Sequence, residues 1–156
     1  MKDIIKMRLI AAFLVGFLCF LVLGNRTVKI PWVAPYLTCE VNGEKIKAFK
    51  NEHMWSFTGN SNLGIRIEKA AEKLEGHKIN AGSSVKIKLS SDKGLKDFKV
   101  KQFVIDDNAV RSNIDVLLKD NTITIAEKPG EYIYSFIAGW NETHWVEYII
   151  KFVVED

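Results

Sequence analysis

The stretch EKPGEYIYSFIAGWNETHWVEYIIKFVV, residues 127–154, decides the predicted fold. After the turn at Pro129-Gly130, every second residue from Tyr132 to Trp140 is apolar, and a second alternating run extends from Val146 to Val154. A period of two places the apolar side chains on one face of a strand. The polar residues Asn141-Glu142-Thr143 separate the two runs. The stretch therefore predicts two long strands, each with one face packed against a hydrophobic core.

A hairpin is predicted nearer the N-terminus, where residues 36–41 and 44–49 flank Asn42-Gly43. Both turn residues accept positive φ, and this dipeptide is the strongest short-range indication of a hairpin. Pairing across the turn sets Cys39 beside Ile46 on an apolar face and Glu40 opposite Lys45. We therefore expect Cys39 to be a buried small apolar residue. A redox or intermolecular role for its thiol is the alternative.

The segments between these hairpins predict further short strands and one short helix. Alternation indicates strands at 85–89, 98–105 and 122–125, with a bulge in the second where the alternation breaks at 103–105. Helical spacing indicates a helix over 65–75, with Gly76 as its C-cap. Residues 110–118 fit no single pattern. About seven strands separated by turns are typical of an all-β, immunoglobulin-like β-sandwich, which we place at residues 36–156.

The N-terminal part predicts export. Sixteen uncharged, mostly apolar residues, Leu9 to Gly24, follow a basic start that contains Lys2, Lys6 and Arg8. Such an order favours a cytoplasmic N-terminus with the remaining chain outside. We interpret residues 1–24 as a cytoplasmic start and a single membrane helix, and residues 25–35 as an extended stalk. If the run is instead a cleaved signal peptide, the protein is secreted, because sixteen residues lie between the usual lengths of the two.

The charge balance argues against nucleic-acid binding. The net charge is +3, but the first eight residues hold three of the 22 basic residues and one of the 19 acidic ones, so residues 25–156 carry only +1. A nearly neutral domain has no long-range field to attract a polyanion. Its single thiol, Cys39, leaves no disulfide within the domain, so the hydrophobic core must supply the stability.

No motif in the chain indicates catalysis, a metal site or a cofactor. The three histidines, His53, His77 and His144, are far apart and lack second ligands at the short offsets of zinc sites, so we expect them in loops or at the surface. No nucleophile elbow or phosphate-binding loop is present. Asp106-Asp107 with Asn108 is typical turn chemistry rather than a calcium loop. We predict a protein that is not an enzyme.

Two groups of residues are candidates for binding. Trp145 lies on the strand face opposite Val146, so it is the best candidate for an exposed contact, together with His144 and Asn141 of the adjacent turn. Lys86 and Lys88 form the cationic outer face of the strand at 85–89. Trp32 either lies at a membrane interface or closes the base of the domain.

The closing segment also carries a resemblance. Residues 127–134, followed by Ala138-Gly139-Trp140 and the terminal strand, resemble the end of many bacterial extracytoplasmic immunoglobulin-like modules. With Trp55-Ser56 and residues 81–87, the chain resembles small membrane-anchored or secreted proteins of Gram-positive bacilli whose role is uncharacterised. Such proteins often carry a cysteine near the tryptophan that corresponds to Trp55, and this chain has none there. The resemblance implies an exported sandwich and no catalytic residues.

These observations predict a non-catalytic extracytoplasmic binding module tethered to the cytoplasmic membrane. Its partner would be an envelope protein or a cell-wall component. The alternative is a sensory or regulatory accessory subunit of a membrane complex, which acts partly through helix contacts of Gly16 and Cys19 within the membrane.

Overall fold

The computed structural model describes residues 30–107 and 109–156. The predicted cytoplasmic start, the apolar run Leu9–Gly24 and the first part of the stalk lie outside the described residues. Within the described part, no helix is long and apolar enough to cross a membrane. The chain separates into two units, residues 1–30 and Pro31–Asp156, and the second is described below.

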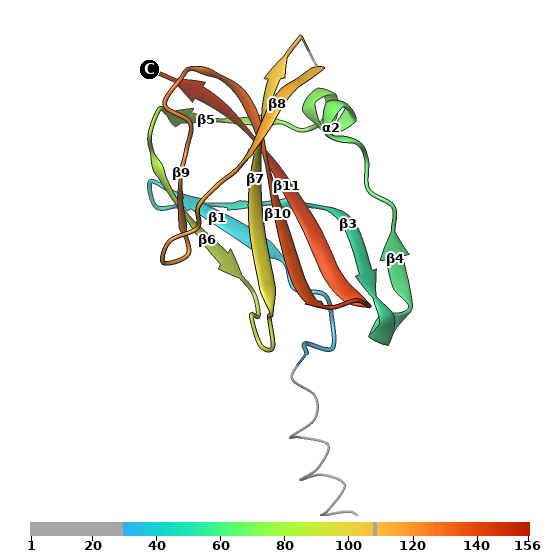
Figure 1. Ribbon diagram of the computed structural model, residues 1–156. Helices are drawn as coiled ribbons and strands as arrows, with labels where there is room; N and C mark the ends of the chain where they lie inside the picture. The colour runs from blue at the N-terminus through green and yellow to red at the C-terminus, as the bar shows by residue number, and fades with distance from the viewer. Residues whose placement is uncertain (1–29, 108) are drawn as a thin grey trace, which may run out of the picture. The chain divides into compact units, whose positions relative to one another are not determined.

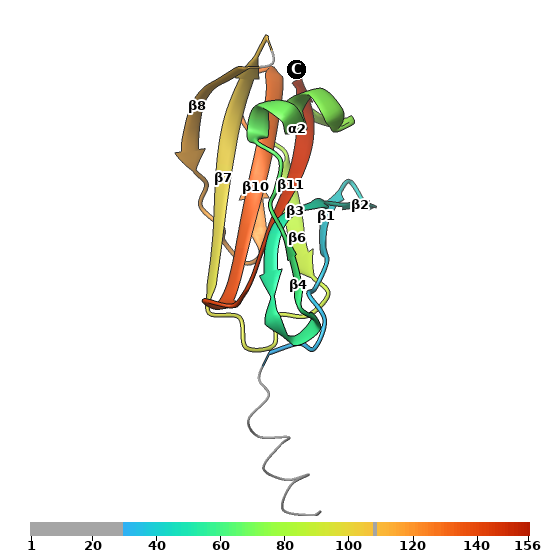
Figure 2. The same cartoon turned by 90° about the vertical axis from the view of Figure 1, so that its right-hand side faces the viewer.

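The second unit is built from two β-sheets, which form two layers in the side view of Figure 2. The four-stranded sheet has the order β2 (Glu44–Lys47), β1 (Leu37–Val41), β6 (Ser84–Leu89), β9 (Thr122–Thr124). The seven-stranded sheet has the order β4 (Asn60–Asn62), β3 (Phe49–Trp55), β11 (His144–Glu155), β10 (Gly130–Asn141), β7 (Asp97–Asp106), β8 (Ala109–Asp115). Its seventh strand, β5 (Gly76–Asn80), pairs in parallel with β11. The predicted all-β class is confirmed.

The two strands of the opening stretch form the centre of the larger sheet (Figure 1). β10 pairs with β11 from Gly130↔Val154 to Asn141↔His144, with an irregularity beside Gly139. The alternating apolar side chains are buried as predicted: Tyr132, Tyr134, Phe136, Ala138, Trp140, Val146, Tyr148, Ile150, Phe152, Val154. Each large apolar side chain that leaves water stabilises the fold by about 1.5–3 kcal/mol, so this strand pair contributes much of the core.

The predicted N-terminal hairpin is also confirmed. Asn42 and Gly43 have φ values of 50° and 86°, and the strands pair Cys39 with Ile46 and Glu40 with Lys45. Cys39 is fully buried, and burial raises the pKa of its thiol to about 12. The thiol therefore stays protonated, which agrees with the interpretation of Cys39 as a small apolar core residue.

The predicted bulge is present, but the extra residue belongs to the partner strand. Val104 of β7 pairs with Ser112 and Ile105 pairs with Val110. Arg111 of β8 is therefore the residue without an opposite partner. The segment whose sequence fitted no single pattern thus forms β8 as far as Asp115.

The predicted helix is shorter than its pattern and ends differently. The helix α2 spans Ile67–Lys73, and its C-cap is Leu74 in an extended conformation, so the assignment of Gly76 as the cap is wrong. Gly76 instead begins β5 beside β11, where a Cβ atom would lie 2.6 Å from Val153 Cγ2. Packing against the neighbouring strand, rather than helix termination, explains this glycine.

The helix covers one end of the outer face of the larger sheet. Ala70 and Ala71 pack against Ile105, Ile133 and Ile149. Those three residues alternate with the ones that face the smaller sheet, so the central strands are buried on both faces at this end. The other end of the outer face carries Trp145.

Candidate functional site

The structure divides the candidate binding residues among three places. Lys86 and Lys88 lie exposed on β6 of the smaller sheet. Asn141 and His144 lie together at the β10–β11 turn. Trp145 belongs to the outer face of the larger sheet, where its partners across the strands are Gly139 and Met54. The structure thus places the five predicted residues as two pairs and one separate side chain.

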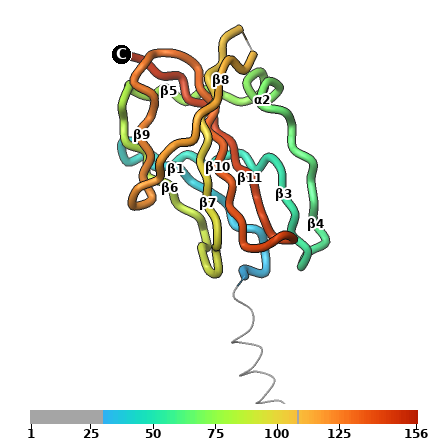
Figure 3. Tube along the Cα trace, in the orientation of Figure 1, coloured from blue at the N-terminus to red at the C-terminus, as the bar shows by residue number. Residues whose placement is uncertain are grey.

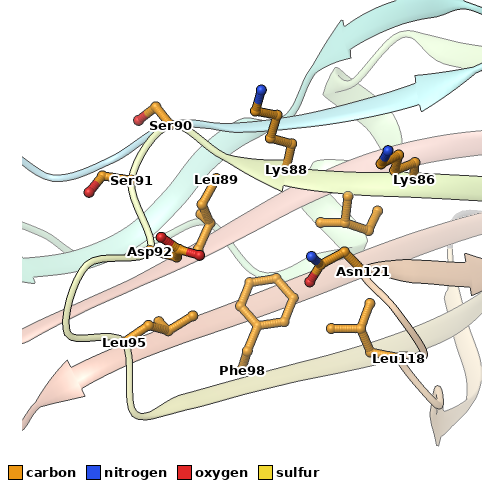
Figure 4. A pocket seen from close by; sticks show the side chains of 11 residues that line it. Lys86, Lys88, Leu89, Ser90, Ser91, Asp92, Leu95, Phe98, Leu118 and Asn121 are labelled. Carbon is orange, nitrogen blue, oxygen red and sulfur yellow. The ribbon is translucent and has the colours of Figure 1, made fainter.

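A cleft adjoins the two lysines. We call it the β6–β7 cleft, because it is lined by β6, the loop after it, the start of β7 and the segment before β9 (Figure 4). Its volume is about 510 Å³, which is within the range of small-molecule sites.

The lining of the β6–β7 cleft combines apolar and polar side chains. The apolar part consists of Leu95, Phe98 and Leu118, and the polar groups include the Asn121 amide and the Asp92 carboxylate. Lys86 and Lys88 lie at the rim, where their side chains project from the outer face of β6 away from Phe98. Among the described residues neither lysine forms an ion pair. Ammonium groups at the rim of an apolar cleft suit a ligand whose anionic groups stay outside the cleft while its apolar or sugar-ring surface enters it.

The cleft is fixed in place by hydrogen bonds of its own backbone. Ser90 N–H donates to Tyr36 O at 2.9 Å, and Tyr36 N–H donates to Ser90 Oγ at 3.0 Å. On the opposite side, Ile87 N–H donates to Asn121 O at 2.7 Å. Asn121 adopts a left-handed φ of 57°. These bonds anchor one loop to the segment before β1 and the other to β6, so the cleft is formed before any ligand binds.

The sequence identified the two lysines at the rim of this cleft and missed its apolar lining. Alternation around Lys86 and Lys88 is a local pattern, whereas Phe98 and Leu118 belong to segments that meet β6 only in the folded sandwich. Their apolar character predicted burial and nothing more specific.

A second candidate lies at the β10–β11 turn, where His144 is held on both sides. Thr143 N–H donates to Asn141 Oδ1 at 3.0 Å, which fixes the orientation of that amide. His144 Nδ1 is 2.9 Å from the same oxygen, so Nδ1 carries the proton and donates it. Nε2 then accepts a hydrogen bond from Ser56 Oγ at 2.9 Å.

The imidazole of His144 is only 3% exposed, so the expectation of a surface histidine is wrong here. Its ring meets Trp55 edge-on at 5.1 Å and Phe57 at 4.3 Å between centroids. Burial lowers the pKa of His144, which favours the neutral tautomer described above. The turn in the sequence concealed this burial, because the residues that cover His144 come from the end of β3 and the segment after it.

Ser56, His144 and Asn141 form a hydrogen-bonded relay whose order resembles that of the Ser-His-Asp triad of hydrolases. Its surroundings favour a structural role. Ser56 N–H donates to Thr143 O at 3.2 Å. Because this N–H already has an acceptor, it cannot stabilise an oxyanion. The rings of Trp55 and Phe57 pack directly on the imidazole that would have to exchange protons with a substrate. The relay ties the end of β3 to the β10–β11 turn.

The solvent exposure of the remaining tryptophans and histidines that the sequence singled out is as follows. Trp145 is half-buried rather than fully exposed. Trp32 is the most exposed tryptophan of the chain, with 66% of its surface accessible. His53, expected in a loop or at the surface, is buried in β3 and 6% exposed, whereas His77 is half-buried in β5. In the described part of the chain, no group of three metal-ligating side chains lies close enough to hold an ion.

Comparison of the chain with protein-family models, with curated proteins and with solved structures finds no match.

Proposed function

We propose that the protein is a non-catalytic extracytoplasmic binding module of the immunoglobulin-like type, held at the cytoplasmic membrane by Leu9–Gly24. The ligand is an anionic polymer of the cell envelope, and it binds in the β6–β7 cleft. The observation that carries this proposal is the pair of exposed, unpaired ammonium groups, Lys86 and Lys88, at the rim of a preformed cleft with an apolar wall.

The positive charge is confined to a small part of a nearly neutral domain, which favours a polymer that is already close to the protein as the ligand. The domain is close to neutral overall, so it gains little from long-range attraction. A tethered domain does not need that attraction, because its ligand is present at high local concentration. Short-range contacts from two lysines then provide selectivity for phosphate or carboxylate groups.

The test is a binding measurement with purified cell-wall polymer and the full chain. We expect the double variant Lys86→Gln/Lys88→Gln to bind at least about tenfold more weakly, because charge-assisted hydrogen bonds contribute roughly 1.5–3 kcal/mol each. The control Lys73→Gln/Lys128→Gln removes the same charge from α2 and from the turn before β10 and should retain the affinity. Equal loss in both variants would indicate nonspecific attraction and would contradict a site in the cleft.

The non-catalytic part of the proposal has a separate test at Ser56. We expect no covalent labelling of Ser56 by a serine-reactive fluorophosphonate, because its own amide is committed to Thr143 O. Labelling at Ser56 that disappears in His144→Gln, while the variant stays folded by circular dichroism, would show that the relay activates the hydroxyl. Such a result would overturn the non-catalytic assignment.

A further inference from the structure

Three exposed apolar side chains gather at one end of the domain. Trp32 and Val33 are 66% and 64% exposed, and Phe57 is 38% exposed. The Trp32 and Phe57 rings stack with centroids 5.2 Å apart and planes within 7° of parallel. We call these three residues the aromatic foot. Large apolar side chains that gather at the surface mark contact sites.

The aromatic foot is held on a rigid base. Trp55 is fully buried, and its Nε1–H donates to Trp32 O at 3.1 Å. Phe57 packs on His144, which is itself fixed by Ser56 and Asn141. The exposed rings are therefore preorganised, so little side-chain entropy would be lost when another surface covers them.

The foot lies at the end of the sandwich where the chain enters the domain at Pro31. In Figures 1 and 2, and in the trace of Figure 3, this end also carries the β10–β11 turn and the loop between β6 and β7, whereas the C-terminus lies at the opposite end. Hydrogen bonds agree with the pictures, because Trp140 Nε1–H donates to Lys93 O of that loop at 3.0 Å.

The length of the connection between the apolar run and Trp32 limits how far this end of the domain can lie from a membrane that the run enters. Eight positions separate Gly24, the last residue of the apolar run, from Trp32, and eight extended residues reach at most about 29 Å. Strand β10 has 12 residues, which corresponds to roughly 36–40 Å. The connection is thus shorter than the sheet, so an inserted run would hold the foot, and not the far end, next to the bilayer.

We propose that the aromatic foot sits in the headgroup region of the membrane that the apolar run enters. This inference rests on the tether in the proposed function. Tryptophan prefers that region because its ring is apolar and its N–H is polar. Val33 and Phe57 would bury their apolar surface beside it. The contact fixes the tilt of the sandwich on the membrane, and the β6–β7 loop at the same end would then lie close to the bilayer.

The experiment uses the full chain in liposomes that contain lipids brominated near the top of the acyl chain. Bromine quenches tryptophan fluorescence only at close range, so Trp32 should be quenched. The chain has four tryptophans, of which Trp55 and Trp140 are fully buried. We expect Trp32→Phe to lose most of the quenching and the matched control Trp145→Phe to retain it. Trp32→Phe leaves the carbonyl that Trp55 binds, so the base of the foot should remain folded.

The outcomes separate this inference from the tether. A chain that floats with liposomes but shows equal quenching in wild type and Trp32→Phe overturns the foot and leaves the tether standing. A chain that does not float contradicts both. A Trp32 that is shielded without quenching, in liposomes where cross-linking shows two chains joined, would identify a second copy as the occupant and would also overturn the proposal.

Discussion

At the scale of single residues, two buried polar side chains in β3 differ in how well they are satisfied. Asn51 accepts a hydrogen bond from Ile65 N–H at 2.8 Å, and it donates to Ile65 O at 3.1 Å and to Glu147 Oε2 at 2.6 Å. His53, two residues later, is buried with neither ring nitrogen bonded to another described group. A buried unsatisfied polar group costs about 1–3 kcal/mol, so His53 is a weak point in the core.

The stability of the domain should fall in mild acid because of His53. Burial, and secondarily the charge of Lys50, lower the pKa of His53 in the folded state, and the Asn60 side chain opposes this only in part. Burial also lowers the pKa of His144. The unfolded chain, with histidine pKa values near 6.5, then binds more protons than the folded one. Stability is therefore complete above about pH 6.5 and declines as the pH falls below it, towards the lowered folded-state values.

Urea denaturation between pH 7.5 and 5 measures this effect. We expect His53→Leu to be at least as stable as the wild type at neutral pH and to lose part of the acid-dependent decline. The double variant His53→Leu/His144→Gln should lose more of the decline, although removal of the His144 hydrogen bonds lowers its stability overall. A decline that is unchanged in both variants would assign the acid sensitivity to other groups.

At the scale of elements, the joint between β5 and β11, which is their parallel pairing, depends on a glycine at position 76. β5 runs parallel to β11, with Gly76 opposite Lys151 and Ile79 opposite Val154. The close approach of Val153 Cγ2 leaves no room for a Cβ atom at residue 76. The same position ends the connection from α2, so the joint sets where the helix can lie over the outer face.

Gly76→Ala should therefore destabilise the domain by about 1–3 kcal/mol, which is typical of overpacking. Thermal or urea denaturation measures the change. The second-site variant Val153→Ala removes the clashing methyl group, so the double variant should be more stable than the additive sum of the two single changes predicts. Gly59→Ala serves as a contrast, because nothing lies within 4 Å of its added Cβ and only the left-handed φ of 60° opposes it.

At the scale of the whole molecule, the two proposed functional surfaces belong to the sandwich, whereas the proposed tether belongs to the first 24 residues. The β6–β7 cleft and the aromatic foot both lie within Pro31–Asp156. Binding of a polymer in the cleft needs the domain to be near the envelope and makes no demand on the sequence of the apolar run.

Replacement of Leu9–Gly24 by an unrelated apolar segment of equal length should therefore retain polymer binding by intact cells or liposomes. The measurement compares bound polymer per chain for the two proteins at equal surface density. Loss of function on this exchange, with the domain still exported and folded, would favour the alternative of an accessory subunit that acts through contacts of Gly16 and Cys19 in the membrane.

The sequence alone determined the elements that depend on residues close together in the chain. Strict alternation in residues 132–140 and 146–154 identified the central strands, and Asn42-Gly43 identified a hairpin together with its register. Alternation also identified Lys86 and Lys88 as an outward cationic pair. These predictions succeeded because strand periodicity and turn conformation depend on neighbouring residues.

Only the tertiary structure decided what those elements enclose. Phe98 and Leu118 complete a cleft below the strand that carries the lysines. Trp55 and Phe57 bury His144 beside a polar turn, and Trp32 is exposed although its sequence surroundings left its position open. Each outcome depends on contacts between segments far apart in the chain. Burial is a property of the assembled sheets, and the pattern along a single strand cannot report which distant loop comes to cover its end.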